Sequence, residues 1–275
     1  MDQLTNVTNG ISTQKLESWR EFYPLIEGTL SRAPAYIFRG QADSEWPINS
    51  SLDRLEKRYP KTYDTFGGIE HEFDCPPVGR DIHIKAFRQA VRHRRGPNTN
   101  ELGYREWWAL AQHHGLATPM LDWTLSPFVA LYFAFEEDLQ SDNRVVLALS
   151  TSVIGEKSSN SNPAPHPYSP MSDTSNRLVA QSGVFLEMPK GTNLEEYVRE
   201  HFTDDSSDKN RHARTILLRI VIKNDDRLGC LRMLNKMNIN RSTLFPDLDG
   251  AAQYINNQWE LGFDTALGYV ADEIE

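Results

Sequence analysis

The sequence predicts an α+β fold in which a single domain is built on a mixed central sheet flanked by helices. A continuous β-rich segment at 215–222 (TILLRIVI) is typical of a central strand that is covered on both faces. A segment at 127–137 (PFVALYFAFEE) is apolar on nearly every side through Phe135, which is typical of a helix buried in the middle of a fold. The composition, with 39% hydrophobic and 24% charged residues over 275 positions, fits a folded chain of this size.

The first 95 residues contain signals for two helices and one strand. Leu16, Trp19, Tyr23 and Ile26 recur at helical spacing, so 12–26 is expected to be a packing helix. Segment 35–41 (AYIFRGQ) is β-prone and is expected to end at Arg39 and Gly40. Segment 59–77 is predicted to be a loop, because it contains Gly-Gly and Pro-Pro pairs, and 84–95 regains helical periodicity.

The middle of the chain predicts two helices in succession. Apolar residues recur from Trp107 at helical spacing up to Gly115, which is well placed to end that helix, and His114 falls on its apolar face. Ser126 can cap the following buried helix, and Pro127 fits its first turn.

The remainder alternates strands, helices and one long insertion. Segment 144–150 (RVVLALS) is expected to be a strand, and 228–238 and 251–260 have helical spacing, with a turn at 243–250 between them. Segment 151–176 is rich in Ser, Asn and Pro, so it is predicted to be a flexible loop insertion.

Composition excludes several functional classes. A net charge of −9 argues against general affinity for nucleic-acid backbones, although a local basic patch is compatible with it. Cys75 and Cys230 have no metal-binding spacing. The first ten residues lack a basic and apolar leader, and no segment approaches the roughly 20 apolar residues of a membrane span, so we expect a cytoplasmic protein that does not bind membranes.

A basic run follows helical spacing at Arg88, Arg92 and Arg95, with His93 and Arg94 beside it. A solvated helix face is the first interpretation, which the net charge favours. A contact with RNA or phosphate is the alternative.

Four polar clusters stand at the ends of apolar elements, where binding groups commonly project. They are FRGQ at 38–41, AQHHGLATPMLDWTLSPFVALYFAF at 111–135, RLVAQSGVF at 177–185 and TLFPDLDG at 243–250. Together and in this order they resemble the FRG domain family, named for its Phe-Arg-Gly motif. The resemblance covers 36–255, and we interpret 1–275 as a single FRG domain.

The resemblance carries functional expectations. Members of the family are often associated with bacterial or phage defence, including toxins. A looser resemblance to ADP-ribosyltransferases, in which an Arg-Gly ends the first strand, implies a related fold, NAD as the nucleotide, and transfer of ADP-ribose to an RNA or protein acceptor. The sequence departs from those enzymes where DWT at 122–124 replaces their serine-rich motif. Whether the chain is an enzyme is left open at this stage.

Arg39 is the first candidate, because a guanidinium can hold a phosphate or carboxylate through two parallel hydrogen bonds, and Gly40 after it would leave room for a ligand. A structural ion pair is the alternative. Asp122 and Thr124 precede a capped helix whose free N–H groups would favour an anion, but either residue could be the cap itself. Asp247 precedes a predicted helix, so it too has a capping alternative.

Two histidines, together with residues from the second half of the chain, complete the list of candidate site residues. His113 and His114 offer an acid or base, against the alternative of core histidines. The catalytic candidates are Arg39, His113, Asp122 and Glu187. The candidates for nucleotide binding are Arg39, Gly40, Gln41, Trp123, Thr124, Gln181, Phe185 and Asp249, with no metal ligands.

Two other functions remain open. One is a metal-assisted nuclease that uses His113, Asp122, Asp247 and Asp249 as ligands, and the other is a non-catalytic module that senses a nucleotide or a phage component. All three functions require the clusters to converge. Arg39 should therefore lie within about 15 Å of Asp122 in one pocket.

Overall fold

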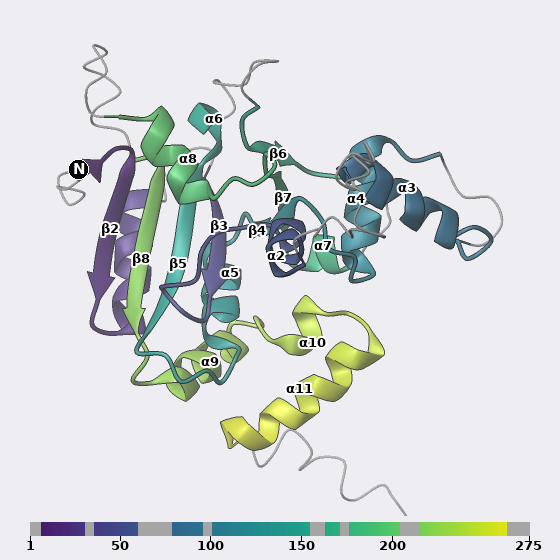
Figure 1. Ribbon diagram of the computed structural model, residues 1–275. Coiled ribbons are helices and arrows are strands. Elements are labelled where there is room, and N and C mark those ends of the chain that lie inside the picture. Colours follow the sequence, from purple (N-terminus) through teal and green to yellow (C-terminus); the bar gives the residue numbers. More distant parts are fainter. Residues whose placement is uncertain are drawn as a thin grey trace, which may run out of the picture.

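The computed structural model describes residues 7–30, 36–59, 79–95, 101–154, 163–170, 176–203 and 215–262, and an eight-stranded sheet is its centre (Figure 1). The strands are β1 (Val7–Thr8), β2 (Ile11–Leu16), β3 (Tyr36–Gln41), β4 (Met120–Thr124), β5 (Asn143–Ser150), β6 (His166–Tyr168), β7 (Gly183–Glu187) and β8 (Leu217–Lys223). Their order across the sheet is β1-β2-β8-β5-β3-β4-β7-β6.

The sheet is mixed, as the sequence predicts. β2 runs parallel to β8, and every other neighbouring pair is antiparallel. β8 and β5 lie in the interior of the sheet, and the odd and even residues of each face different apolar clusters. The predicted α+β class with a central sheet flanked by helices is confirmed.

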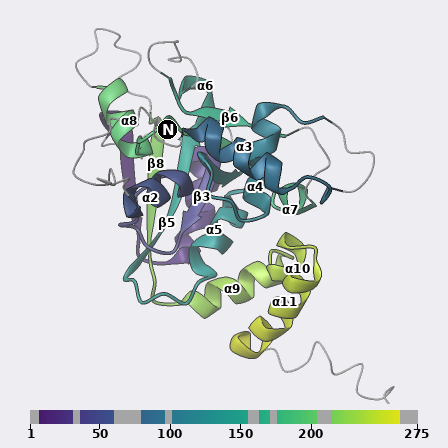
Figure 2. The same ribbon diagram turned by 45° about the vertical axis from the view of Figure 1, so that its right-hand side comes forward.

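The helical elements surround this sheet and extend beyond one end of it (Figures 1 and 2). They are the 3-10 helix η1 (Trp19–Glu21), α1 (Phe22–Leu25), the π-helix η2 (Ile26–Leu30), α2 (Ser51–Arg58), α3 (Arg80–Ala90), α4 (Tyr104–His113), α5 (Pro127–Phe135), α6 (Thr151–Ile154), α7 (Asn176–Ala180), α8 (Leu194–His201), α9 (Arg227–Lys236), α10 (Arg241–Leu244) and α11 (Leu248–Leu261).

Two helical layers cover the two faces of the sheet. On one face α1, α5 and α9 pack against residues such as Phe38 and Ile220, and on the other α8 packs against residues such as Ile37 and Leu217. The helix α5 is the innermost: Ala130, Ala134 and Phe135 are fully buried, as the apolar sequence of this segment predicts.

A third cluster joins the helices α2, α3 and α4 to the far end of the sheet. Trp108 is fully buried at its centre, and Met120 of β4 and Phe185 of β7 contribute from the sheet. α3 and α4 lie side by side at this end of the molecule (Figures 1 and 2).

The helix expected over 12–26 is wrong for its first third. Residues 11–16 form β2, whose backbone pairs with β8 along its whole length from Ile11 to Leu16. Helical structure begins only at Trp19, after Ser18 caps the turn by accepting a hydrogen bond from the backbone N–H of Arg20. Pairing with a strand that is 206 residues further along the chain overrides the local helical spacing of Leu16, Trp19, Tyr23 and Ile26.

The insertion at 151–176 contains regular structure in the parts that are described. Its first turn is α6, and 166–168 form β6, which pairs with β7 from His166 to Tyr168. Residues 155–162 and 171–175 of this insertion, and 60–77 of the loop expected over 59–77, lie outside the described residues.

Within the described part of the chain, no helix has both the length and the apolar character that a transmembrane span requires.

Candidate functional site

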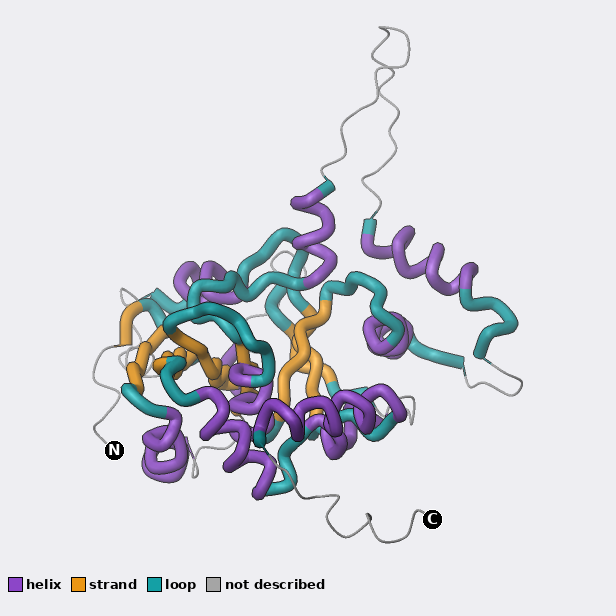
Figure 3. Tube along the Cα trace, turned by 90° about the horizontal axis from the view of Figure 1, so that it is seen from below, coloured by secondary structure: helices purple, strands orange, loops and turns teal. Residues whose placement is uncertain are grey.

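The sheet opens between β3 and β4. The two strands share only one backbone pair, Phe38 with Thr124, whereas β3 pairs with β5 along its full length and β4 pairs with β7 along its full length. Seen from below, the strands accordingly lie in two groups (Figure 3). Beyond Phe38, the edge of β3 at Arg39–Gln41 therefore has no backbone partner on the β4 side.

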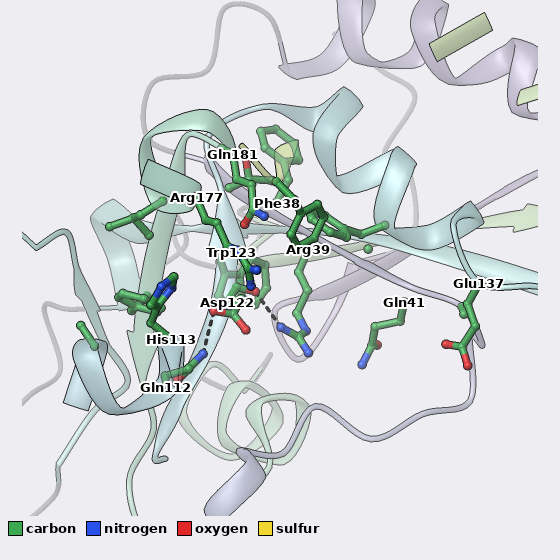
Figure 4. Close-up of a pocket in the computed structure, with 18 of the residues that line it drawn as sticks. Phe38, Arg39, Gln41, Gln112, His113, Asp122, Trp123, Glu137, Arg177 and Gln181 are labelled. Atoms are coloured by element: carbon green, nitrogen blue, oxygen red, sulfur yellow. Dashed lines mark hydrogen bonds between the residues drawn. The ribbon is translucent and has the colours of Figure 1, made fainter. Parts of the chain in front are cut away.

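A cavity of about 730 Å³ occupies this opening (Figure 4). That volume is within the range of sites that enclose small molecules and cofactors. Its walls combine charged, polar and aromatic side chains from β3, β4, β7, α2, α4, α5, α7 and the connection after α10. The charged members are Arg39, Arg54, Asp122, Glu137 and Arg177; the polar members include Gln41, Gln112, His113, Thr124 and Gln181; the aromatic members are Phe38, Trp46, Trp123, Phe133, Phe185 and Phe245.

Arg39 bridges the opening in the sheet. Its Nη1 donates a hydrogen bond of 2.7 Å to the main-chain oxygen of Asp122, so a side chain from β3 contacts β4 where backbone pairing has ceased. Its Nε is buried and has no hydrogen-bond partner among the described residues. Burial lowers the pKa of Arg39; the Asp122 carboxylate counteracts this and the neighbouring Arg54 adds to it. An anion in the cavity would compensate this guanidinium.

Asp122 is held by a short relay from α4. The side-chain amide of Gln112 donates to Oδ1 of Asp122 at 2.6 Å, and the buried hydroxyl of Thr118 donates in turn to Oε1 of Gln112. The carboxylate faces the cavity and remains accessible to water there. Protein nevertheless surrounds it closely enough that burial raises the pKa of Asp122, with Arg39 and the Gln112 hydrogen bond counteracting the rise.

His113 is the last residue of α4 and borders the same cavity. Burial lowers the pKa of His113, and the positive charges of His114 and Arg177 lower it further, whereas Asp247 acts in the opposite direction. These effects favour the neutral form of the imidazole, which can accept a proton. His114, expected on the apolar face, is instead exposed and caps the end of α4, followed by Gly115 at φ 84°.

The C-terminal helices close one side of the cavity. Arg177 forms an ion pair with Asp247, with Nε to Oδ2 at 2.7 Å, and Gln181 donates from Nε2 to the main-chain oxygen of Leu244 at 3.1 Å. The ring centroid of Phe245, which lines the cavity, lies 5.3 Å from the guanidinium carbon of Arg177 and 3.8 Å from that of Arg241.

The structure shows which residues cap the helices α5 and α11, where the sequence left capping and ligand binding as alternatives. Ser126, as expected, caps α5 by accepting from the backbone N–H of Val129. Thr124 fixes the turn before it: its hydroxyl donates to the main-chain oxygen of Gln181 at 2.6 Å and accepts from the N–H of Ser126. Asp247 caps α11 through Gly250 while also pairing with Arg177. Asp122 and Thr124 themselves belong to the strand β4.

Most of the predicted site residues lie around this one cavity. Those that line it are Arg39, Gly40, Gln41, His113, Asp122, Trp123, Thr124, Gln181 and Phe185. Glu187 lies elsewhere, because it forms an ion pair of 2.7 Å with Arg105. Asp249 is exposed in the first turn of α11 and does not line the cavity. The expectation that Arg39 and Asp122 share one pocket is met.

Gly40 has a different role from the one expected. It is paired with Val146 inside β3, and a Cβ at this position would lie 1.9 Å from the main-chain oxygen of Ala130 in α5. The space that its missing side chain leaves is thus occupied by the backbone of α5. The glycine allows close packing of helix on strand and does not make room for a ligand.

The cavity residues that were not identified from the sequence include Arg54, Gln112, Arg177 and Phe245. Gln112 and Arg177 stand within the quoted clusters, beside the residues that were chosen, so the motif itself could have indicated them. Arg54 lies on α2, where its Nη1 is held by the main-chain oxygen of Asn49 at 2.7 Å, and nothing local in the sequence marks it as a cavity residue.

The ligand set of a metal-assisted nuclease is not assembled here. Across the described ranges, no group of three or more His, Cys, Asp or Glu side chains could hold a metal ion. Of the four ligands that this alternative requires, only His113 and Asp122 line the cavity.

Comparison with known families matches residues 34–143 to the family model of the FRG domain. Over these 110 residues the chain is similar to the FRG domain, in agreement with the resemblance of its motifs. The FRG match includes β3, α4, β4 and α5, and thus Arg39, Gln112 and Asp122 of the cavity, while the clusters at 177–185 and 243–250 lie beyond it. No curated protein and no solved structure matches the chain significantly.

Proposed function

We propose that the cavity of this FRG domain binds a nucleotide that carries phosphate groups, such as NAD. The observation that carries the proposal is the position of Arg39 where β3 and β4 separate. A guanidinium has five N–H donors, and one of them bonds to the Asp122 main-chain oxygen in the described structure. Its buried Nε has no described partner, and a phosphate or ribose oxygen would supply one.

The rest of the cavity suits the other parts of a nucleotide. Arg54 and Arg177 add positive charge at the walls, and Phe38, Trp123 and Phe185 offer aromatic surface against which a base or a nicotinamide ring can pack. The indole N–H of Trp123 is buried and has no hydrogen-bond partner among the described residues. This N–H is a second donor that a polar ligand group could engage.

The looser resemblance to ADP-ribosyltransferases supports transfer of ADP-ribose from NAD to a macromolecule. In that reaction the bond between the ribose C1′ and the nicotinamide nitrogen breaks, and its electron pair leaves with nicotinamide. The acceptor then forms a bond to C1′ and releases a proton. Asp122 is the carboxylate inside the cavity that Gln112 orients, so it can stabilise positive charge on the ribose. His113, whose lowered pKa favours the neutral imidazole, can accept the proton.

We infer a cytoplasmic setting and a part in bacterial or phage defence from the family resemblance. An RNA or a protein would be the acceptor. The alternative of a non-catalytic sensor uses the same cavity and differs only in whether NAD is turned over.

Calorimetric titration with NAD and with ADP-ribose tests binding, and chromatographic detection of released nicotinamide tests turnover. Arg39→Lys should weaken binding at least about tenfold, because lysine cannot form two parallel hydrogen bonds to one phosphate. Arg58→Lys is the matched control, since Arg58 is exposed at the end of α2 and does not line the cavity.

Three outcomes separate the readings. Binding with nicotinamide release supports the transferase. Binding without release supports the sensor. The proposal is contradicted if the protein binds neither NAD nor ADP-ribose. It is also contradicted if Arg39→Lys and the wild-type protein bind these ligands with equal affinity.

A further inference from the structure

A second concave surface lies beside α3 and α4, away from the sheet. It encloses about 560 Å³ and is lined by Lys85, Arg88, Arg92, Arg95 and His93, together with Gln89, Val91 and Trp107. We call it the basic groove. None of the described residues that line it carries a carboxylate.

Positive charge is concentrated here against the balance of the whole chain. The described segment 79–95 carries six of the 29 Lys and Arg residues and only one of the 38 Asp and Glu residues, in a protein whose net charge is −9. Repulsion among neighbouring cations is unfavourable, so such clustering calls for a compensating anion.

For three of these cations the described residues provide no compensating carboxylate. Lys85, Arg88 and Arg92 are exposed, and no described carboxylate lies within ion-pair distance of them. Arg105 on the neighbouring α4, in contrast, is paired with Glu187 at 2.7 Å. Attraction to the C-terminal end of α3 favours one or two cations in the last turn and does not account for the whole set.

Two of the arginines are positioned by an aromatic ring. The guanidinium carbons of Arg88 and Arg95 lie 5.0 and 4.8 Å from the ring centroid of Trp107. Trp107 itself is only 8% exposed, so it forms the base of the groove and cannot stack on a ligand ring. The groove therefore offers charge and hydrogen-bond donors rather than an apolar anchor.

We propose that the basic groove binds the phosphodiester backbone of a single-stranded nucleic acid. A concave track of cations can follow such a backbone, which has one negative charge per nucleotide. Binding through phosphates, without a stacking platform, predicts little sequence preference. A membrane surface fits less well, because interfacial binding uses exposed Trp, Phe or Leu on the same face, and Trp107 is covered.

The helix α4 connects the basic groove with the cavity. Trp107 belongs to the groove, and Gln112 and His113 on the same helix belong to the cavity, about 8 to 9 Å further along the helix axis. A single-stranded nucleic acid bound in the groove would thus lie near the cavity. The proposal stands on the groove alone and does not require that the cavity bind NAD.

Fluorescence anisotropy of the full chain with labelled single-stranded RNA and DNA of about 20 nucleotides tests this. We expect binding of both, with affinity falling between about 50 and 200 mM salt along a log–log slope of about −2 to −3, as for three or four neutralised phosphates. The triple variant Lys85→Gln, Arg88→Gln, Arg92→Gln should lose at least about tenfold in affinity and show a shallower slope.

The matched control is Lys57→Gln, Arg58→Gln, Lys236→Gln, which removes three exposed cations and the same net charge elsewhere. It should bind as wild type does. Circular dichroism checks that both triple variants are folded. If a triple variant does not fold, single substitutions of the same residues are tested in its place. Arg39→Lys should bind RNA normally, which separates this site from the nucleotide cavity.

Wild-type affinity in the groove variants, or equal loss in the control variant, overturns the proposal. So does a marked preference for duplex DNA, or for vesicles containing phosphatidylserine, over single strands.

Discussion

The guanidinium of Arg39 lies 2.7 Å from the main-chain oxygen of Asp122, at the point where β3 and β4 stop pairing. This contact joins the FRG motif to the second conspicuous motif of the chain, LDWT at 121–124. It also places a positive group at the entrance to the only region where two neighbouring strands of the described sheet separate after a single pair. The same residue therefore connects the halves of the sheet and presents donors to the cavity between them.

Arg39→Lys is expected to separate these two roles. Lysine retains the charge and can still reach the Asp122 oxygen with one donor, so the free energy of unfolding should fall by only about 1 kcal/mol. Ligand affinity should fall at least about tenfold, because the planar fork is lost. Chemical denaturation and calorimetric titration of the same preparation measure both. A loss of several kcal/mol in stability would instead make Arg39 a structural residue.

Gln112→Met should change the pKa of Asp122 while leaving Asp122 itself unsubstituted. The Gln112 hydrogen bond lowers the pKa of Asp122 against the rise caused by burial, so its removal should move that pKa further upward. Carboxyl ¹³C NMR titration measures this directly. Any function that needs ionised Asp122 should then be lost at a higher pH than in wild type, as pH falls through the raised pKa.

Gln41→Met is the control for this experiment, because Gln41 lines the same cavity and makes no described hydrogen bond to Asp122. An Asp122 titration that is the same in wild type and Gln112→Met would show that the relay from Thr118 does not control this carboxylate.

The parts of the fold that were predicted correctly are those whose signal is local. The buried helix α5, with Ser126 as cap and Pro127 in its first turn, could be identified because its sequence is apolar on all sides. β5 and β8 were recognised from continuous runs of β-branched and aliphatic residues. These signals depend on neighbouring residues alone.

The errors occur where distant pairing decides the structure. Residues 11–16, expected in a helix, form a strand because β8 is their partner, and the strand at 120–124, for which no element was predicted, forms because β7 pairs with every residue of that segment. The site shows the same limit. Arg54 lines the cavity through tertiary packing, and Glu187 lies outside it in an ion pair with Arg105, so neither position could be inferred from adjacent residues.

Gly40→Ala should destabilise the protein strongly. The added methyl group would approach the backbone of α5 at Ala130 to 1.9 Å, and neither a strand in the middle of a sheet nor a buried helix can easily move away. We expect the free energy of unfolding to fall by about 3 kcal/mol or more. Gly28→Ala serves as control, since a Cβ there meets nothing within 4 Å, and it should change stability by less than about 1 kcal/mol. Similar unfolding midpoints for both variants would refute the close-packing role.

The titration of His113 should report on the ion pair that closes the cavity. Its pKa lies below the ordinary value because of burial and the positive charges of His114 and Arg177, while Asp247 opposes the shift. Arg177→Gln removes a positive charge and also frees the Asp247 carboxylate, so both effects should raise the pKa of His113. Asp247→Asn retains a side chain that can cap α11 but removes the negative charge, so it should lower that pKa. Imidazole NMR titration of the two variants should thus show shifts of opposite sign, and shifts of the same sign, or none, would mean that His113 does not face the Arg177–Asp247 pair.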